Sequence, residues 1–115
     1  MAFTSFEKIY ITETLEKLMK KRRPPENVRH EADLGYKIDN QSVIIFEIVT
    51  RWDDKTQKTE VPVAKTTWVK TKQAWKIYWM RGNLKWHSYS PVPEVESISE
   101  FTKIVDEDKH SCFWG

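Results

Sequence analysis

Aromatic and basic side chains are interspersed in residues 75–89 of this sequence, WKIYWMRGNLKWHSY. Bases of single-stranded nucleic acid stack on aromatic side chains while lysines contact phosphates, so such a mixture could bind nucleic acid or another anionic partner. An ordinary solvated sheet surface is also rich in Tyr and Lys, and that interpretation stays open. The candidate side chains are Lys65, Lys76, Tyr78, Lys85, His87 and Tyr89.

Charge is unevenly distributed along the chain, although the net charge of the 115 residues is only +2. Residues 55–89 contain eight Lys or Arg and one acid, whereas residues 94–108 contain six acids and one Lys. This asymmetry indicates a basic surface on one part of the molecule. The acidic segment could instead lie beside the basic one and partly neutralise it.

Three acids suggest an alternative chemistry, a metal-dependent hydrolase. Glu47 lies in an apolar run, Asp53-Asp54 follow it, and with Lys65 they would form a nuclease-like set. The acid-x-lysine spacing that such nucleases use on a strand is missing. We expect Glu47 to pair with Lys65 or Arg51, because an unpaired buried carboxylate is costly. Asp53-Asp54 also fit the opening of a turn.

Other catalytic patterns are missing from the sequence. His30, His87 and His110 are isolated and show no metal-ligand spacing. The lone Cys112 forms no disulfide framework, and it has acids rather than bases near it, which does not favour a reactive thiolate. Three glycines cannot build a phosphate loop. No catalytic residue, metal or cofactor is therefore predicted.

The elements that must position these side chains form a single α+β domain over residues 1–115. A capping box at Thr4 and Glu7 begins an N-terminal helix that Pro24-Pro25 ends, and Ser97 and Glu100 begin a short C-terminal helix. Between the helices, alternating segments predict a five-stranded antiparallel meander. The strands are expected at residues 34–38, 43–52, 63–70, 75–80 and 84–89.

The parity of the tryptophans predicts which face is buried. A turn at residues 71–74 places Lys70 opposite Trp75, and a two-residue turn at Gly82-Asn83 places Trp79 opposite Trp86. Trp68, Trp75, Trp79 and Trp86 then share one face and form the core beneath the helices. The six candidate side chains would lie on the opposite, exposed face. A slip by one residue would exchange the two faces.

The second strand is apolar on both faces, since Val43, Ile45 and Val49 alternate with Ile44, Phe46 and Ile48. One helical layer cannot cover both faces, so the C-terminal tail or a second copy of the chain should cover the other; a homodimer is expected. The longest apolar run is too short to span a bilayer, and the start MAFTSFEKIY lacks the apolar core of a signal peptide. We expect no membrane partner and a cytoplasmic location.

Several short motifs resemble a family of short bacterial proteins catalogued as a domain of unknown function. They span nearly the whole chain: Arg22-Arg23-Pro24-Pro25, Leu34-Gly35-Tyr36, Arg51-Trp52, Pro62-Val63-Ala64-Lys65, residues 75–79, Trp86-His87-Ser88-Tyr89 and Phe113-Trp114-Gly115. The resemblance implies a stand-alone bacterial protein of the kind found on mobile gene cassettes. It supplies no activity or catalytic residue.

The leading hypothesis from the sequence is a non-enzymatic, dimeric binding module whose basic Tyr/His/Lys face meets nucleic acid or another anionic partner. The alternative is a self-associating structural or accessory protein without a ligand. A metal-dependent hydrolase is the third interpretation.

Overall fold

Helix α1 (Ser5–Arg22) begins at the predicted capping box in the computed structural model, which describes residues 3–114. The Thr4 hydroxyl accepts the Glu7 N–H at 3.2 Å, and the Glu7 carboxylate accepts the Thr4 N–H at 2.8 Å. These two bonds satisfy amide groups that a helix start leaves free. The buried residues of α1 recur at helical spacing and form one apolar stripe: Ile11, Leu15, Leu18 and Met19.

The predicted antiparallel meander is confirmed, with the strand order β1-β2-β3-β4-β5. A sixth short strand, β6, pairs with β4 beside β5 and was not predicted. A 3-10 turn at Glu26–Val28 joins α1 to the sheet, and another at Lys70–Lys72 joins β3 to β4. The strands are β1 (Ala32–Asp39), β2 (Ser42–Thr50), β3 (Lys58–Val69), β4 (Ala74–Met80), β5 (Trp86–Ser88) and β6 (Glu94–Val95).

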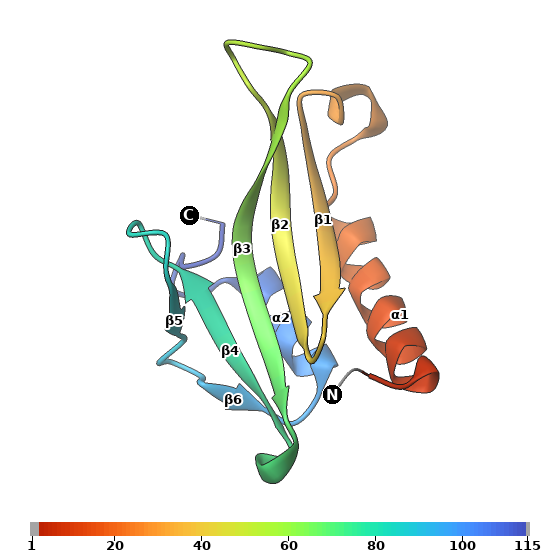
Figure 1. Ribbon diagram of the computed structural model, residues 1–115, viewed down its shortest axis with the longest axis vertical. Coiled ribbons are helices and arrows are strands. Elements are labelled where there is room, and N and C mark those ends of the chain that lie inside the picture. The colour runs from red at the N-terminus through yellow and green to blue at the C-terminus, as the bar shows by residue number, and fades with distance from the viewer. Residues whose placement is uncertain (1–2, 115) are drawn as a thin grey trace.

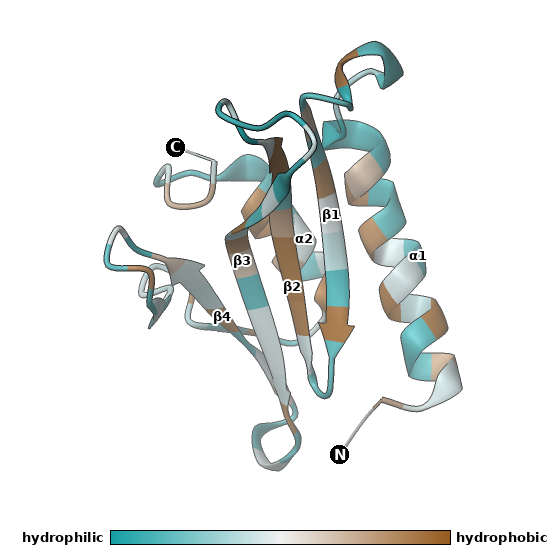
Figure 2. Cartoon of the chain, turned by 45° about the horizontal axis from the view of Figure 1, so that its top comes forward, coloured by the Kyte–Doolittle hydropathy of each residue, from teal (hydrophilic) through white to brown (hydrophobic). Residues whose placement is uncertain are grey.

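Both α-helices, α1 and α2 (Ile98–Glu107), pack on one face of the sheet (Figure 1). Leu15 of α1 and Phe101 of α2 are fully buried against Ile45 of β2 and Ile77 of β4, which are also fully buried. Burial of each such side chain stabilises the fold by about 1.5–3 kcal/mol. Figure 2 shows apolar residues along much of β2. No helix of residues 3–114 covers the opposite face of the sheet.

The segment after α2 docks on the core beside that helix, so it does not cover the opposite face of the sheet. Asp108 has a φ of 40°, and its carboxylate accepts the N–H groups of Cys112, Phe113 and Trp114 at 2.9, 3.1 and 2.9 Å. The Phe113 ring is buried, and the Trp114 indole N–H donates to the Val105 carbonyl at 2.8 Å. A single carboxylate therefore organises the whole turn.

The hairpin of β3 and β4 keeps the predicted faces but not the predicted pairs. Trp68 lies opposite Trp75, whereas the sequence placed Lys70 there. The difference arises because residues 70–72 form a 3-10 turn, which Gln73 closes with a φ of 49°. The pairing therefore differs from the predicted one by two residues, and an even shift leaves every side chain on its predicted face. Trp75 is buried, and Trp68 packs against the core at its edge.

The hairpin of β4 and β5 corrects the predicted register by one residue. Trp79 lies opposite His87, and Met80 lies opposite Trp86. The connection is not a two-residue turn: the Leu84 N–H donates to the Arg81 carbonyl at 2.8 Å, and Leu84 has a φ of 60°. This extra residue rotates β5 by one position, so every β5 side chain changes face.

Candidate binding face

The surface of interest is the helix-free face, the side of the sheet opposite α1 and α2. Its central row runs across five strands through Lys37, Ile44, Lys65, Tyr78 and Ser88. The rows above and below it add further apolar, aromatic and basic side chains. Those used below are Phe46, Ile48, Thr67, Lys76, Met80 and Trp86.

Lys65 lies between two aromatic rings of this face. Its Nζ atom is 5.5 Å from the centre of the Tyr78 ring and 5.8 Å from the centre of the Trp86 ring. Both rings are half-buried, so each keeps surface open to solvent. Among the ion pairs of residues 3–114, none includes Lys65. The ammonium group is therefore held by ring faces rather than by an acid.

Other cations and acids surround this cluster. Lys76 lies on the same face, one strand from Thr67, but its other neighbour is Glu94 of β6. Lys37 pairs with Glu60 at 3.3 Å. Lys85 is exposed in the β4–β5 turn. Among residues 3–114, Lys65, Lys76 and Lys85 are all without an ion pair, since Glu94 pairs with Lys72, and Lys65 is the one of the three whose ammonium group lies beside two rings.

His87 and Tyr89 do not lie where the sequence placed them. Both have the parity of Trp79, which points toward the helices, because the β4–β5 connection contains the extra residue. The Tyr89 ring is 2% exposed and packs 5.0 Å from the Phe113 ring. The predicted exposed tyrosine is therefore wrong, and Trp86 occupies the helix-free face instead.

The apolar part of the helix-free face is centred on Phe46. An added Cβ at Gly35 would lie 3.0 Å from Cε2 of Phe46, so the ring rests directly on the glycine. The Lys37 Nζ atom lies 5.5 Å from the centre of the same ring, which is only 7% exposed. Ile44 and Ile48 are half-buried on either side of it. These contacts give the face a rigid apolar backing beside the Lys65 cluster.

The acids of the hydrolase alternative do not converge. In the strand ladder Glu47 lies opposite Leu34 and Val61 on the side of the helices, while Lys65 lies opposite Ile44 on the other side, so the expected pairing of Glu47 with Lys65 is wrong. A bulge between Ile45 and Phe46 in the β2–β3 pairing accompanies this difference. Within residues 3–114, no group of three His, Cys, Asp or Glu side chains is placed to hold a metal ion.

Asp53 and Asp54 instead organise the β2–β3 loop. The Arg51 guanidinium donates to both oxygens of Asp53 at 3.0 and 2.7 Å, and this bond lowers the pKa of Asp53. Asp54 accepts the backbone N–H and the hydroxyl of Thr56, which lowers its pKa as well. Trp52 lies beside them and is 92% exposed.

Cys112 has the environment of an unreactive thiol. Burial raises its pKa, and the negative charge of Asp108 raises it further. The thiolate, which is the reactive form, is therefore disfavoured at neutral pH.

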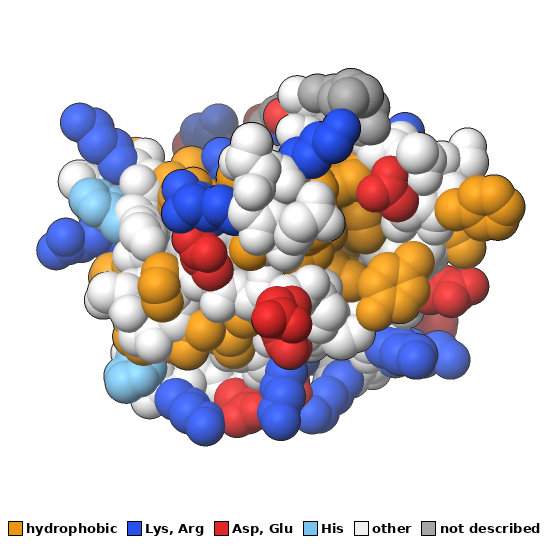
Figure 3. Space-filling model, turned by 90° about the horizontal axis from the view of Figure 1, so that it is seen from below, with side chains coloured by type: hydrophobic (Ala, Val, Ile, Leu, Met, Phe, Trp, Pro, Cys, Tyr) orange, Lys and Arg blue, Asp and Glu red, His pale blue; other side chains and the backbone are white. Residues whose placement is uncertain are grey.

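Two hollows lie away from the helix-free face. One lies between α2 and residues 89–95, next to Tyr89. The other lies at the end of the molecule that carries the β3–β4 turn, and it is lined mainly by aromatic and aliphatic groups, including Phe3, Phe6, Tyr10 and Trp68. Seen from that end, apolar side chains emerge among charged ones (Figure 3). Neither α-helix of the described chain combines the length and apolar character that a bilayer crossing demands.

Comparison with known proteins gives one match. The family model described as "Domain of unknown function (DUF3024)" matches residues 3–115. No curated protein and no solved structure matches the chain.

Proposed function

This chain belongs to the DUF3024 family, and we propose that it is a binding module whose helix-free face holds single-stranded nucleic acid. The observation that carries the proposal is the position of the Lys65 ammonium group between the Tyr78 and Trp86 rings, 5.5 and 5.8 Å from their centres. Two half-exposed rings and an unpaired cation are the elements that a base and its phosphate need.

Binding would rearrange this cluster in a defined way. Each base that stacks on Tyr78 or Trp86 contributes about 1–3 kcal/mol. The flexible Lys65 side chain, which covers the rings in the free protein, would turn outward to a phosphate. Lys76 would extend the cationic track along the same face, and Lys85 would approach from the turn. A cytoplasmic location and the local excess of Lys and Arg in residues 55–89 are consistent with such a partner.

The test is a fluorescence-anisotropy titration of a dye-labelled oligo-dT strand and of the same strand as a duplex. Tyr78→Leu should weaken binding of the single strand by roughly fivefold to a hundredfold, because the variant loses the stacking energy of one base. Lys65→Gln should weaken binding and reduce the slope of log K against log salt by about 0.7. Matched controls are Tyr10→Leu and Lys17→Gln, both exposed on α1.

Absence of single-strand binding at low salt would remove the nucleic-acid proposal. So would equal losses of affinity in the α1 controls, because binding would then follow overall charge rather than the cluster. A preference for the duplex would also contradict it, since paired bases cannot stack on side chains.

A second candidate, self-association, is favoured by the apolar character of β2 on the helix-free face. Ile44, Phe46 and Ile48 all lie there without a covering helix. A homodimer that buried this face would need about 1,200–2,000 Å² of total contact. Sedimentation velocity distinguishes the candidates: a tight dimer that Ile44→Asp dissociates favours self-association and leaves the nucleic-acid platform covered.

A further inference from the structure

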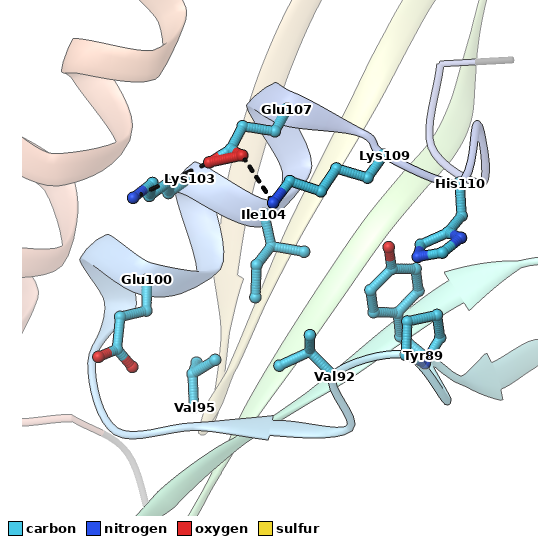
Figure 4. Close-up of a pocket in the computed structure, with 10 residues that line it drawn as sticks. Tyr89, Val92, Val95, Glu100, Lys103, Ile104, Glu107, Lys109 and His110 are labelled. Carbon is cyan, nitrogen blue, oxygen red and sulfur yellow. Dashed lines mark ion pairs between the residues drawn. The ribbon is translucent and has the colours of Figure 1, made fainter.

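A pocket of about 390 Å³ lies between α2 and residues 89–95, on the side of the sheet that carries the helices (Figure 4). Its apolar lining includes Val92, Val95 and Ile104. Tyr89 and His110 lie together at one end, with their ring centres 6.2 Å apart. This size suits a small ligand, since such sites commonly measure about 300–1,000 Å³.

The Tyr89 hydroxyl is the unusual group in this pocket. The residue is only 2% exposed. No hydrogen bond among residues 3–114 includes its oxygen, and no fully buried side-chain oxygen in that range lacks a partner, so this oxygen reaches solvent at the pocket wall. Burial raises the pKa of Tyr89, and the charges of Cys112 and Asp108 raise it further, so the hydroxyl stays protonated at neutral pH. The hydroxyl is therefore a free donor at the pocket wall, where an acceptor of a bound ligand would replace the water that it meets.

The two acids and two lysines at the rim balance in charge, and the lysines keep donors that an anion could use. Glu107 lies 4.0 Å from the Lys103 ammonium group and 3.5 Å from that of Lys109, and Figure 4 shows both pairs. Glu100 accepts the Glu96 N–H at 2.9 Å. Both acids are therefore engaged. Each ammonium group has three donors and is largely exposed, so the lysines keep donors for a ligand.

We propose that this pocket binds a small carboxylic acid with an apolar body. The body would lie on Val92, Val95 and Ile104, and the carboxylate would accept the Tyr89 hydroxyl proton as a hydrogen bond beside Lys109 and His110. The site does not depend on the proposed nucleic-acid face, because the two lie on opposite sides of the sheet.

The experiment titrates the ¹⁵N-labelled full chain with phenylacetate, and separately with phenethylamine, and follows amide chemical shifts by NMR. Phenylacetate should give saturable shifts at residues 89–95 and 103–110, with a dissociation constant on the order of millimolar, as expected for so few atoms. Phenethylamine carries the same ring with the opposite charge and should bind at least about tenfold more weakly, because it offers no acceptor to the Tyr89 donor.

Two variants test the assigned contacts. Tyr89→Phe removes only the hydroxyl and should weaken phenylacetate binding about tenfold, the usual value of a hydrogen bond to a charged group. Its matched control is Tyr10→Phe, which removes a hydroxyl that faces Ser99 outside the pocket and should leave binding unchanged. Val92→Phe fills the cavity from a loop and should abolish binding while the remaining amide shifts stay native.

Three results would overturn the proposal. They are the absence of saturable shifts around the pocket, phenethylamine binding as tight as that of phenylacetate, and an unchanged affinity in Tyr89→Phe. Failure here leaves the oligo-dT experiment unaffected, because that experiment reads the other face.

Discussion

Replacement of Leu84 by glycine should stabilise the protein, because Leu84 has a left-handed backbone with a φ of 60°. That conformation costs a residue with a side chain about 1–2 kcal/mol. Glycine avoids this cost but loses about 0.5–1 kcal/mol more conformational entropy on folding. The Leu84 side chain is 80% exposed, so little packing is lost. We expect the free energy of unfolding to rise by about 0.5–1 kcal/mol.

Gly82→Ala is the matched control for Leu84→Gly. A Cβ at Gly82 would meet nothing within 4 Å, and the backbone there is not left-handed. We expect a change within about 0.5 kcal/mol. A two-residue turn at Gly82-Asn83 predicts the reverse pattern, because both hairpin turn types, I′ and II′, need a positive φ at the first central residue, Gly82. The pair of variants therefore distinguishes the two registers of β5.

The assay is urea denaturation followed by far-UV circular dichroism, with the slope m compared between variants to verify that the folded and unfolded states are alike. Destabilisation by Leu84→Gly together with a loss of about 1 kcal/mol in Gly82→Ala would refute the reasoning. Trp86 and Tyr89 would then exchange faces, and both proposed sites would lose a key ring.

Asp33→Asn should lower the free energy of unfolding by about 1 kcal/mol at neutral pH, because Arg23 donates two bonds to Asp33 and lowers its pKa to about 2. The depressed pKa contributes stability above about pH 4 that disappears toward pH 2, so urea denaturation should show the two proteins converging there. Asp108→Ala removes the acceptor of three backbone N–H groups and should cost about 2–3 kcal/mol. Carboxypeptidase digestion should then release the docked tail faster, and an unchanged digestion rate would contradict the role of Asp108. Trp75→Ala should cost about 3–5 kcal/mol, whereas Trp52→Ala should change stability by less than about 0.5 kcal/mol, as thermal denaturation will measure.

The helices and most strands of this fold could be predicted from the sequence, because short local patterns specify them. The Thr4 and Ser97 caps begin the two helices, and hydrophobic alternation marks β1 to β5. β6 was missed because two residues carry no periodicity. Its pairing with β4 depends on the path of the chain after Pro91, which is a tertiary property.

Which face each ring occupies was only partly predictable, because faces depend on the exact length of each turn. Trp68, Trp75 and Trp79 were assigned correctly, since the β3–β4 turn preserved parity. Trp86 and Tyr89 lie on the faces opposite to those predicted, because the β4–β5 turn contains one more residue than expected. Gly82-Asn83 is a strong signal for a two-residue turn, and no sequence rule favours a left-handed leucine. The sequence thus placed Lys65 and Tyr78 correctly on the helix-free face, but it assigned Trp86 to the core.

The joining of α1 to α2 has a consequence for the synthesis of this protein. The Arg22 guanidinium meets the Asp106 carboxylate at 2.9 Å, and Phe101 and Val105 of α2 complete the cover over Ile77. A nascent chain that has reached only β5 lacks that cover. The growing polypeptide therefore exposes apolar core residues until residues 98–114 leave the ribosome. The hydrophobic core can be completed only after that segment has been translated.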